Sequence, residues 1–240
     1  MPEIEVHNNV ITHLALVEYF TKSQSGKICL LYGDERVFSL SLLLASHTLA
    51  KNKTLAVIDG CNRFGVHTIS TFARQRRIRP EVLLKKIYIS RGFTSYQMEA
   101  ALTERLVPFL KRIGSDTALV FGLLDTFYDE QVPFREVKEM LRRILLYLDR
   151  MRRQGISILL VSKDWNIRPV ERNQLFDTMK QAADTIYRLA EISTELDKQI
   201  KTKRRNLDAN DEIKFLVEKE RSKNYGQNTP NIYENNRRRD

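Results

Sequence analysis

The chain alternates between short apolar runs and longer segments in which apolar residues recur with helical spacing. Runs of five or six residues made mostly of aliphatic and aromatic side chains predict buried β-strands. The expected strands are residues 27–32, 54–59, 86–90, 117–121, 156–161 and 185–189. Because these runs are apolar at consecutive positions, both faces of each strand have to be covered.

The segments between these runs predict helices. In residues 134–154, Val137, Met140 and Leu141 begin a series spaced i, i+3, i+4 and i+7, and Gly155 is expected to end this helix. The other expected helices are residues 38–50, 68–77, 95–113 with Pro108 as a kink or break, and 174–183.

Apolar strands that are separated by helices predict an α/β fold with an open, doubly wound, mostly parallel sheet flanked by helices. Ligands of such sheets bind at the carboxyl ends of the strands, so the residues after each strand are the first candidates for a site. The pattern weakens after Leu189, where residues 191–205 suggest a helix and 212–218 an edge strand. We expect one core domain over residues 1–221 and a basic, disordered tail over 222–240.

The composition predicts a folded and basic protein. The 240 residues are 42% hydrophobic, which is enough for a core, and the formal net charge is +10. Residues 198–240 carry 12 basic against 7 acidic side chains. Such a field attracts polyanions, nucleic acid first. The alternative is a charge that only keeps the protein in solution.

Several chemistries lack their residues. Cys29 and Cys61 are too few for a disulfide framework, and the four histidines have no metal-ligand spacing. No apolar run reaches the ~20 residues that span a bilayer, and the first residues lack the order of a signal peptide. We therefore expect no metal, no membrane contact and a cytoplasmic location.

The turn after the first expected strand is where a phosphate-binding loop would lie. That loop reads G-x-x-x-x-G-K-[ST], because its glycines let backbone N–H groups surround phosphates that its lysine neutralises. Residues 33–40 read GDERVFSL instead. Gly33 is kept, but Phe38, Ser39 and Leu40 replace the second glycine, the lysine and the hydroxyl. The two acids after Gly33 place negative charge where a triphosphate would lie.

Together with this turn, four further segments give the chain a resemblance to the RecA/RadA recombinase core and, more widely, to the KaiC and DnaB relatives. Residues 56–64 (AVIDGCNRF), 119–128 (LVFGLLDTFY) and 183–189 (ADTIYRL) are similar to the family's YIDTEGTF, LIVDSATALY and ADTVLRL. Residues 87–97 (IYISRGFTSYQ) resemble the ISRAFT-x-x-Q block of small prokaryotic RadA-like proteins. The resemblance implies a RecA-like core over most of residues 1–221 and a role in DNA recombination or repair.

On the family pattern, the groups that hydrolyse ATP are replaced. The activating glutamate falls on Cys61, the Walker B aspartate on Gly122 and the γ-phosphate-sensing glutamine on Lys163. Without a lysine, a base and a metal ligand, in-line hydrolysis has no route. We expect no ATPase activity and no cofactor. The alternative is an atypical Mg·ATP site built from Gly33, Ser39, Ser41 and Asp125.

The resemblance also implies a pair of residues that acts in trans. Lys219 and Arg221 lie where KaiC- and DnaB-like proteins place a Lys-x-Arg finger, which reaches the nucleotide of a neighbouring subunit. The chain would then be a subunit of a homo-oligomer, or of a hetero-oligomer with a RecA/RadA-like ATPase. The alternative is an exposed basic pair on an edge strand.

Cations beside an aromatic ring after the fifth expected strand offer the combination that single-stranded DNA needs. The basic run at 201–205 would bind phosphate without reading sequence. The candidate DNA-binding residues are Lys163, Trp165, Arg168, Arg172, Lys203, Arg204 and Arg205. Two further basic clusters, in residues 74–86 and 142–153, are also ordinary features of helix ends and polar helix faces.

Three hypotheses follow. The first is a RecA/RadA-like protein that has lost ATP hydrolysis and binds DNA non-specifically, or joins a recombinase or related ATPase as an accessory subunit. The second is an atypical nucleotide-binding ATPase. The third is a scaffold whose sheet edge or finger pair docks a partner and which has no role with nucleic acid.

Overall fold

The computed structural model describes residues 3–6, 26–128, 131–164 and 170–189, all within one compact unit, residues 1–191. The helix expected at 191–205, the strand expected at 212–218 and the boundary expected near Arg221 lie outside the described residues.

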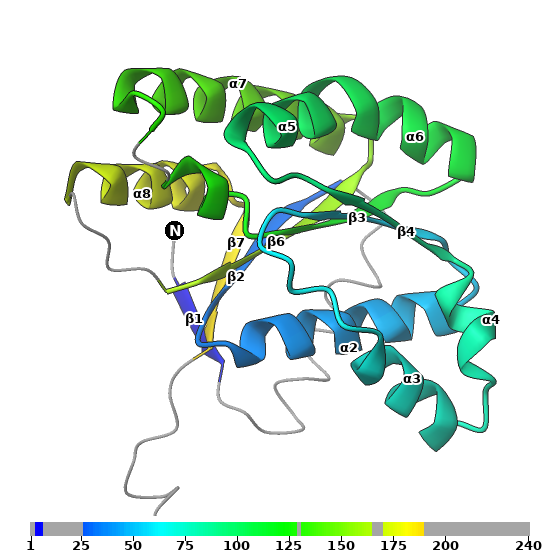
Figure 1. Cartoon of the computed structure of the whole chain (residues 1–240). Coiled ribbons are helices and arrows are strands. Elements are labelled where there is room, and N and C mark those ends of the chain that lie inside the picture. Colours follow the sequence, from blue (N-terminus) through cyan, green and yellow to red (C-terminus); the bar gives the residue numbers. More distant parts are fainter. Residues whose placement is uncertain (1–2, 7–25, 129–130, 165–169, 190–240) are drawn as a thin grey trace, which may run out of the picture. The chain divides into compact units, whose positions relative to one another are not determined.

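The described strands form one seven-stranded sheet in the order β1-β7-β2-β6-β5-β3-β4, and every neighbouring pair runs parallel (Figure 1). The strands are β1 (Glu3–Val6), β2 (Ile28–Gly33), β3 (Leu55–Asp59), β4 (Ile87–Arg91), β5 (Thr117–Phe121), β6 (Ser157–Lys163) and β7 (Thr185–Leu189). The chain therefore leaves a gap between β2 and β3, and β5 and β6, which come later in the sequence, occupy it.

Helices cover both faces of the sheet (Figure 1). One face carries α2 (Arg36–Ala50), α3 (Val66–Gln75) and α4 (Pro80–Leu84). The other carries α5 (Ser95–Ala100), α6 (Leu106–Ile113), α7 (Phe134–Arg153) and α8 (Asn173–Ala182). This arrangement confirms the α/β class and the doubly wound parallel sheet, the fold class of a RecA-like core.

The core has two layers because successive side chains of a strand point to opposite faces. Along β2, Leu30 packs in the cluster beneath α7 and α8, whereas the adjacent Leu31 packs in the cluster beneath α2 and α3. Both side chains are fully buried. Consecutive apolar residues in the sequence therefore follow from burial on both faces.

The expected strands are confirmed to within two residues, and the helix expected at 95–113 is divided. A π-helical turn, Ala101–Arg105, joins α5 to α6. Pro108 has no N–H to donate to the carbonyl of Glu104, and a wider turn lets the helix path continue past this position.

Apart from short 3-10 turns, one strand and one α-helix of the described residues were not expected. The strand β1 has only four residues and two glutamates, and it pairs with β7. The helix α4 has only five residues; it begins with Pro80 at a position where a missing N–H has no cost, and it buries Leu83. Both are shorter than the window in which periodicity is detectable.

Phe121, at the end of β5, is fully buried, and its ring meets that of Phe38 edge-to-face at a centroid distance of 5.6 Å. We predict that Phe121→Ala lowers the free energy of unfolding by about 3–5 kcal/mol, because it removes the ring and leaves a cavity. Phe121→Leu is expected to cost less than about 2 kcal/mol. Urea denaturation measures both, and equal losses would contradict this packing.

Candidate functional site

The candidate site lies where β2, β3, β5 and β6 end. The register places Gly33 beside Lys163 and Asp59 beside Phe121, so the segments after these strands emerge at one edge of the sheet. We call it the carboxyl edge. It is the edge at which parallel α/β sheets bind ligands.

Gly33 is retained for packing reasons that do not involve phosphate. Its φ is +148°, and a Cβ at this position would lie 2.5 Å from the carbonyl oxygen of Leu189 in β7. Only glycine allows the two backbones to approach this closely. The presence of the first glycine of a phosphate-binding loop is thus explained by the sheet itself.

The residues after the turn belong to the first turns of α2, where their side chains face the core or the solvent. Phe38 is buried in the core beneath α2. Ser39 is exposed. Ser41 is fully buried, and its hydroxyl donates to the carbonyl of Phe38 at 2.7 Å. The structure therefore separates the two serines that an atypical nucleotide site would use.

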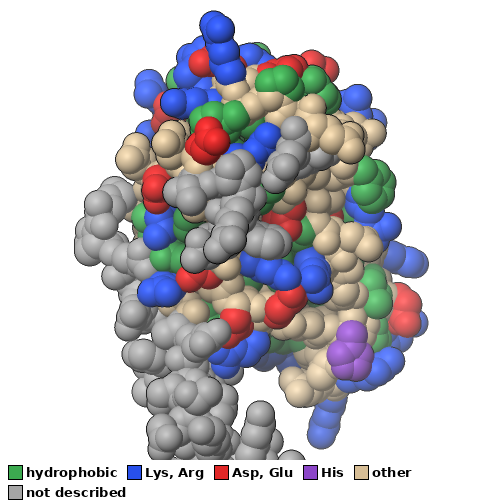
Figure 2. Space-filling model, turned by 60° about the vertical axis from the view of Figure 1, so that its left-hand side comes forward, with side chains coloured by type: hydrophobic (Ala, Val, Ile, Leu, Met, Phe, Trp, Pro, Cys, Tyr) green, Lys and Arg blue, Asp and Glu red, His purple; other side chains and the backbone are tan. Residues whose placement is uncertain are grey.

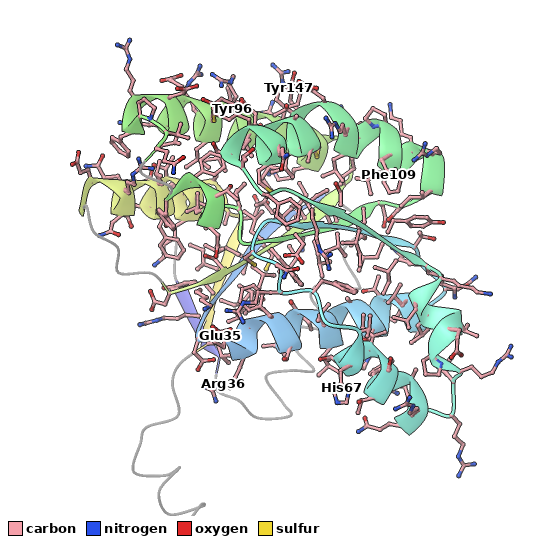
Figure 3. The ribbon with its side chains drawn as sticks, in the orientation of Figure 1. Glu35, Arg36, His67, Tyr96, Phe109 and Tyr147 are labelled. Atoms are coloured by element: carbon pink, nitrogen blue, oxygen red, sulfur yellow. The ribbon has the colours of Figure 1, made fainter. Side chains whose placement is uncertain are left out.

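The two acids of the turn are both paired within the chain. The carboxylate of Asp34 accepts hydrogen bonds from the backbone N–H of Arg36 at 2.9 Å and from the guanidinium of the same residue. The hydrogen bonds from Arg36 lower the pKa of the Asp34 carboxyl. Glu35 forms a bidentate ion pair with Arg63, in which each carboxylate oxygen lies 3.1 Å from one guanidinium nitrogen. It also forms an ion pair with Lys163. Figure 3 shows Glu35 and Arg36 at the start of α2.

We call Glu35, Arg63 and Lys163 the edge triad. Its side chains come from three different segments, and Arg63 also lies over the ring of Phe38, 6.0 Å from its centroid. Figure 2, which turns the left side of Figure 1 forward, shows acidic and basic side chains interleaved on this face. A carboxylate thus occupies the position opposite two cations that a bound anion would otherwise take.

Asp59 is used to hold the loop after β3. It is 1% exposed and accepts from the backbone N–H groups of Arg63 at 3.1 Å, Phe64 at 3.0 Å and Cys61 at 3.3 Å. A carboxylate with three backbone donors shapes a turn and has little freedom to coordinate a metal. Among the described residues, no cluster of three or more metal-ligating side chains is present.

Gly122, which the family resemblance aligns with the Walker B aspartate, has no room for a side chain. Its φ is +58°, and a Cβ would lie 2.4 Å from the Cβ of Cys61 and 2.7 Å from Oδ2 of Asp125. Burial and the neighbouring Asp125 and Asp59 raise the pKa of the Cys61 thiol well above its ordinary value. Cys61 packs against Gly122, and its thiol donates to Oδ1 of Asp59 at 3.8 Å.

Asp125 is the unusual group of the carboxyl edge. Within the described part of the chain its Oδ2 is buried and has no hydrogen-bond partner. Burial raises the pKa of this carboxyl to about 6, although Lys163 and Arg63 oppose the shift. The side chain lies in the 3-10 turn Asp125–Phe127, past the end of β5.

The candidate DNA-binding residues are found in different environments. Lys163 is in the edge triad. Arg172 is 4% exposed and donates to the carbonyls of Phe127 and Val132, the latter at 2.7 Å. Because this guanidinium is buried and bonded to backbone carbonyls, Arg172 is not available to contact DNA. Outside the described residues lie Trp165, Arg168, Lys203, Arg204, Arg205, Lys219 and Arg221.

The structure has a pocket at the β4 edge that the sequence pattern does not indicate. The apolar run at 86–90 predicts a buried strand, but four of the five residues of β4 are exposed, including Tyr88 and Ile89 at 43% and 44%. Beside it is a pocket of about 530 Å³ between β3, β4 and α6, with Ile58, Ala101 and Phe109 in its lining. The ring of Phe109, labelled on α6 in Figure 3, meets that of Tyr88 at 5.4 Å.

Comparison of the sequence with protein-family models and with curated proteins finds no match. None of the described helices combines the length and the apolar composition that crossing a bilayer needs.

We predict that Asp125→Asn stabilises the protein above pH 7 and has no such effect near pH 4. The folded-state pKa of about 6 exceeds the ordinary value of 3.8, so the folded chain holds the proton more tightly than the unfolded chain. Rising pH therefore removes stability between about pH 4 and pH 6, by about 2–3 kcal/mol in all. An amide does not ionise and escapes this loss.

Urea denaturation of both proteins at pH 4 and pH 8 measures the effect. A variant that is equally stable or less stable than the wild-type protein at pH 8 would show that Asp125 is satisfied as a carboxylate.

Proposed function

We propose that this chain is a RecA/RadA-like protein that does not hydrolyse ATP, binds DNA without sequence preference, and serves as an accessory subunit of a recombinase or related ATPase in recombination or repair. The observation that carries this proposal is the edge triad. In it, Glu35 supplies an internal anion to Arg63 and Lys163, at the edge of the sheet where such folds bind phosphate.

The electrostatics of the triad oppose a triphosphate. Both ion pairs share Glu35, whose side chain is 56% accessible, so solvent screens them and they contribute little to stability. The effect on binding is larger, because a nucleotide would have to displace one carboxylate and then lie beside another, Asp34. No lysine of the turn compensates for this repulsion, since Ser39 stands at that position.

Two further features support the loss of hydrolysis. Gly122 has no room for a magnesium-binding carboxylate, and Asp59 is committed to three backbone donors. The chain would therefore contribute to a nucleotide-dependent assembly through its surfaces and not through turnover of its own.

We predict that the wild-type chain turns over no Mg·ATP and gives no thermal shift with pyrophosphate, whereas Glu35→Gln acquires pyrophosphate binding. The substitution leaves Arg63 and Lys163 without their carboxylate and removes one negative charge, so affinity is expected to rise at least about tenfold. Calorimetric titration with pyrophosphate measures it. The matched control is Glu139→Gln, which removes the half-exposed partner of Arg142 on α7.

Equal pyrophosphate affinity in the two variants would refute the role of Glu35 as an internal anion. Turnover of Mg·ATP that Asp125→Ala abolishes would establish the alternative, an atypical ATPase.

The β4 edge favours a docking role, which the accessory subunit and the pure scaffold share. Strand β4 ends the sheet, so along one side its backbone has no neighbouring strand among the described residues. An extended segment of a partner could add to this edge and place an apolar side chain in the pocket beside Ala101 and Phe109. Two guanidinium groups that line the pocket, Arg105 and Arg112, favour acidic residues in that segment.

We predict that Ile89→Lys abolishes co-elution of this chain with a RecA/RadA-type ATPase of its own cell in size-exclusion chromatography. A charge on an edge strand opposes strand addition. Leu146→Lys on α7 is the matched control, because its side chain is similarly exposed, at 49% against 44%. Loss of co-elution in both variants would place the contact elsewhere, and a wild-type chain that neither co-elutes nor binds DNA would exclude the proposed function.

A further inference from the structure

The exposed cations of the described residues fall into two groups, those with a carboxylate partner and those without one. On α7, Arg142, Arg143 and Arg152 form ion pairs with Glu139, Glu99 and Asp149. At the carboxyl edge, Arg63 and Lys163 share Glu35. A phosphate group would have to compete with these carboxylates.

Members of the second group are spread over several elements, for example Lys111 and Arg112 on α6 and Arg150 on α7. Five of them lie close together in sequence where α3 ends and α4 begins. We call this part the α3–α4 corner, and its members are Arg74, Arg76, Arg77, Arg79 and Lys85. All five are exposed, and within the described part of the chain none of them forms an ion pair. Glu81 is the one acid in residues 74–86.

The backbone of the corner presents these side chains in a fixed arrangement. Helix α3 ends at Gln75, and Arg77 follows with φ at +58°, while the N–H of Ile78 donates to the carbonyl of Ala73 at 2.9 Å. Glycine is the usual residue in this left-handed position, which disfavours an L side chain. An arginine at a strained position is better explained by use of its charge than by the stability of the turn.

Packing anchors the corner from below. Ile78 lies against the core cluster of α2 and α3, and Leu83 of α4 is 1% exposed in the same cluster. The guanidinium of Arg76 lies over the ring of Phe72, 4.4 Å from its centroid. The cations are thus held on a rigid support, so less conformational entropy is lost when they bind a ligand.

The corner is separate from the carboxyl edge. The residue after the corner is Lys86, whose carbonyl accepts a hydrogen bond from the N–H of Leu55 at the start of β3. The corner therefore lies toward the amino ends of β3 and β4. Figure 1 shows α4 at the right of the sheet and the start of α2, which follows Gly33, at the left. A ligand at the corner would leave the carboxyl edge and its triad untouched.

We propose that the α3–α4 corner binds the phosphate backbone of double-stranded DNA without reading its sequence. The inference rests on the DNA-binding part of the proposed function and names its surface. Guanidinium forks fit phosphate oxygens in pairs. Residues 74–86 include no aromatic side chain on which an unpaired base could stack, so a duplex is favoured over a single strand.

A membrane surface is less well matched. Binding in the headgroup region needs apolar side chains that insert beside the cations. In residues 74–86, Val82 is the one large apolar side chain that is exposed, at 39%.

The test is fluorescence anisotropy of the full chain with two labelled DNA duplexes of unrelated sequence, at several salt concentrations from 50 to 200 mM. The corner variant is Arg74→Gln, Arg77→Gln, Arg79→Gln. The matched control on α7 is Arg142→Gln, Arg150→Gln, Arg153→Gln, which removes the same number of positive charges. Circular dichroism checks that both variants are folded.

We expect the corner variant to lose at least about tenfold in affinity at 50 mM salt, equally for both sequences. The slope of log affinity against log salt should fall by about 0.9 for each phosphate contact that is lost. The α7 control is expected to change affinity less than about threefold, because only the net charge of the chain is altered.

Equal losses in the two variants, with wild-type binding intact, would overturn the corner while leaving DNA binding in place. A wild-type chain that binds neither duplex at 50 mM salt would remove the DNA part of the proposed function and this inference with it. Affinity that differs between the two sequences would contradict a contact made only to the backbone. Binding to phosphatidylserine vesicles but not to DNA would assign the corner to a membrane surface.

Discussion

The contact of one carboxylate, Glu35, with two cations from other segments is the interaction on which the functional argument depends. It closes the edge of the sheet where a ligand of this fold class would sit. Its partners explain its position: Arg63 belongs to the loop that Asp59 holds by backbone hydrogen bonds, and Lys163 ends the strand next to β2. Two cations thus meet at this edge, and the anion that pairs with them is part of the chain.

The residues around this contact are explained by the packing of the sheet. Gly33 remains because β7 passes too close for any Cβ, and Gly122 remains because Cys61 and Asp125 fill the space beside it. Phe38 fills the core where a glycine would expose backbone N–H groups to a ligand. Residues that resemble motif positions are therefore fixed by packing, and their presence does not by itself indicate a nucleotide.

The sequence was sufficient for the fold because burial on both faces leaves a direct pattern of solid apolar runs, as in 117–121, which matches β5 to the residue. It was insufficient for β4, whose Ile87, Tyr88 and Ile89 give the same pattern although the strand is exposed at the edge. Position in the sheet is a long-range property that a local window cannot contain.

The same limit applies to the site. The mismatch of residues 33–40 with the phosphate-binding pattern is visible in the sequence, but the pairing of Glu35 with Lys163, far apart in sequence, is not.

Basic residues illustrate why charge patterns alone do not locate a binding surface. The clusters at 74–86 and at 142–153 have similar content, and both lie at ordinary places for cations on helices. The structure separates them by the position of carboxylates: Glu99 reaches Arg143 from α5, and Asp184 reaches Arg152 from the turn before β7. No comparable acid reaches the corner from another element within the described residues. Free positive charge on this surface is thus set by which acids the fold brings near, and this is why a polyanion is better matched to the end of α3 than to the longer basic face of α7.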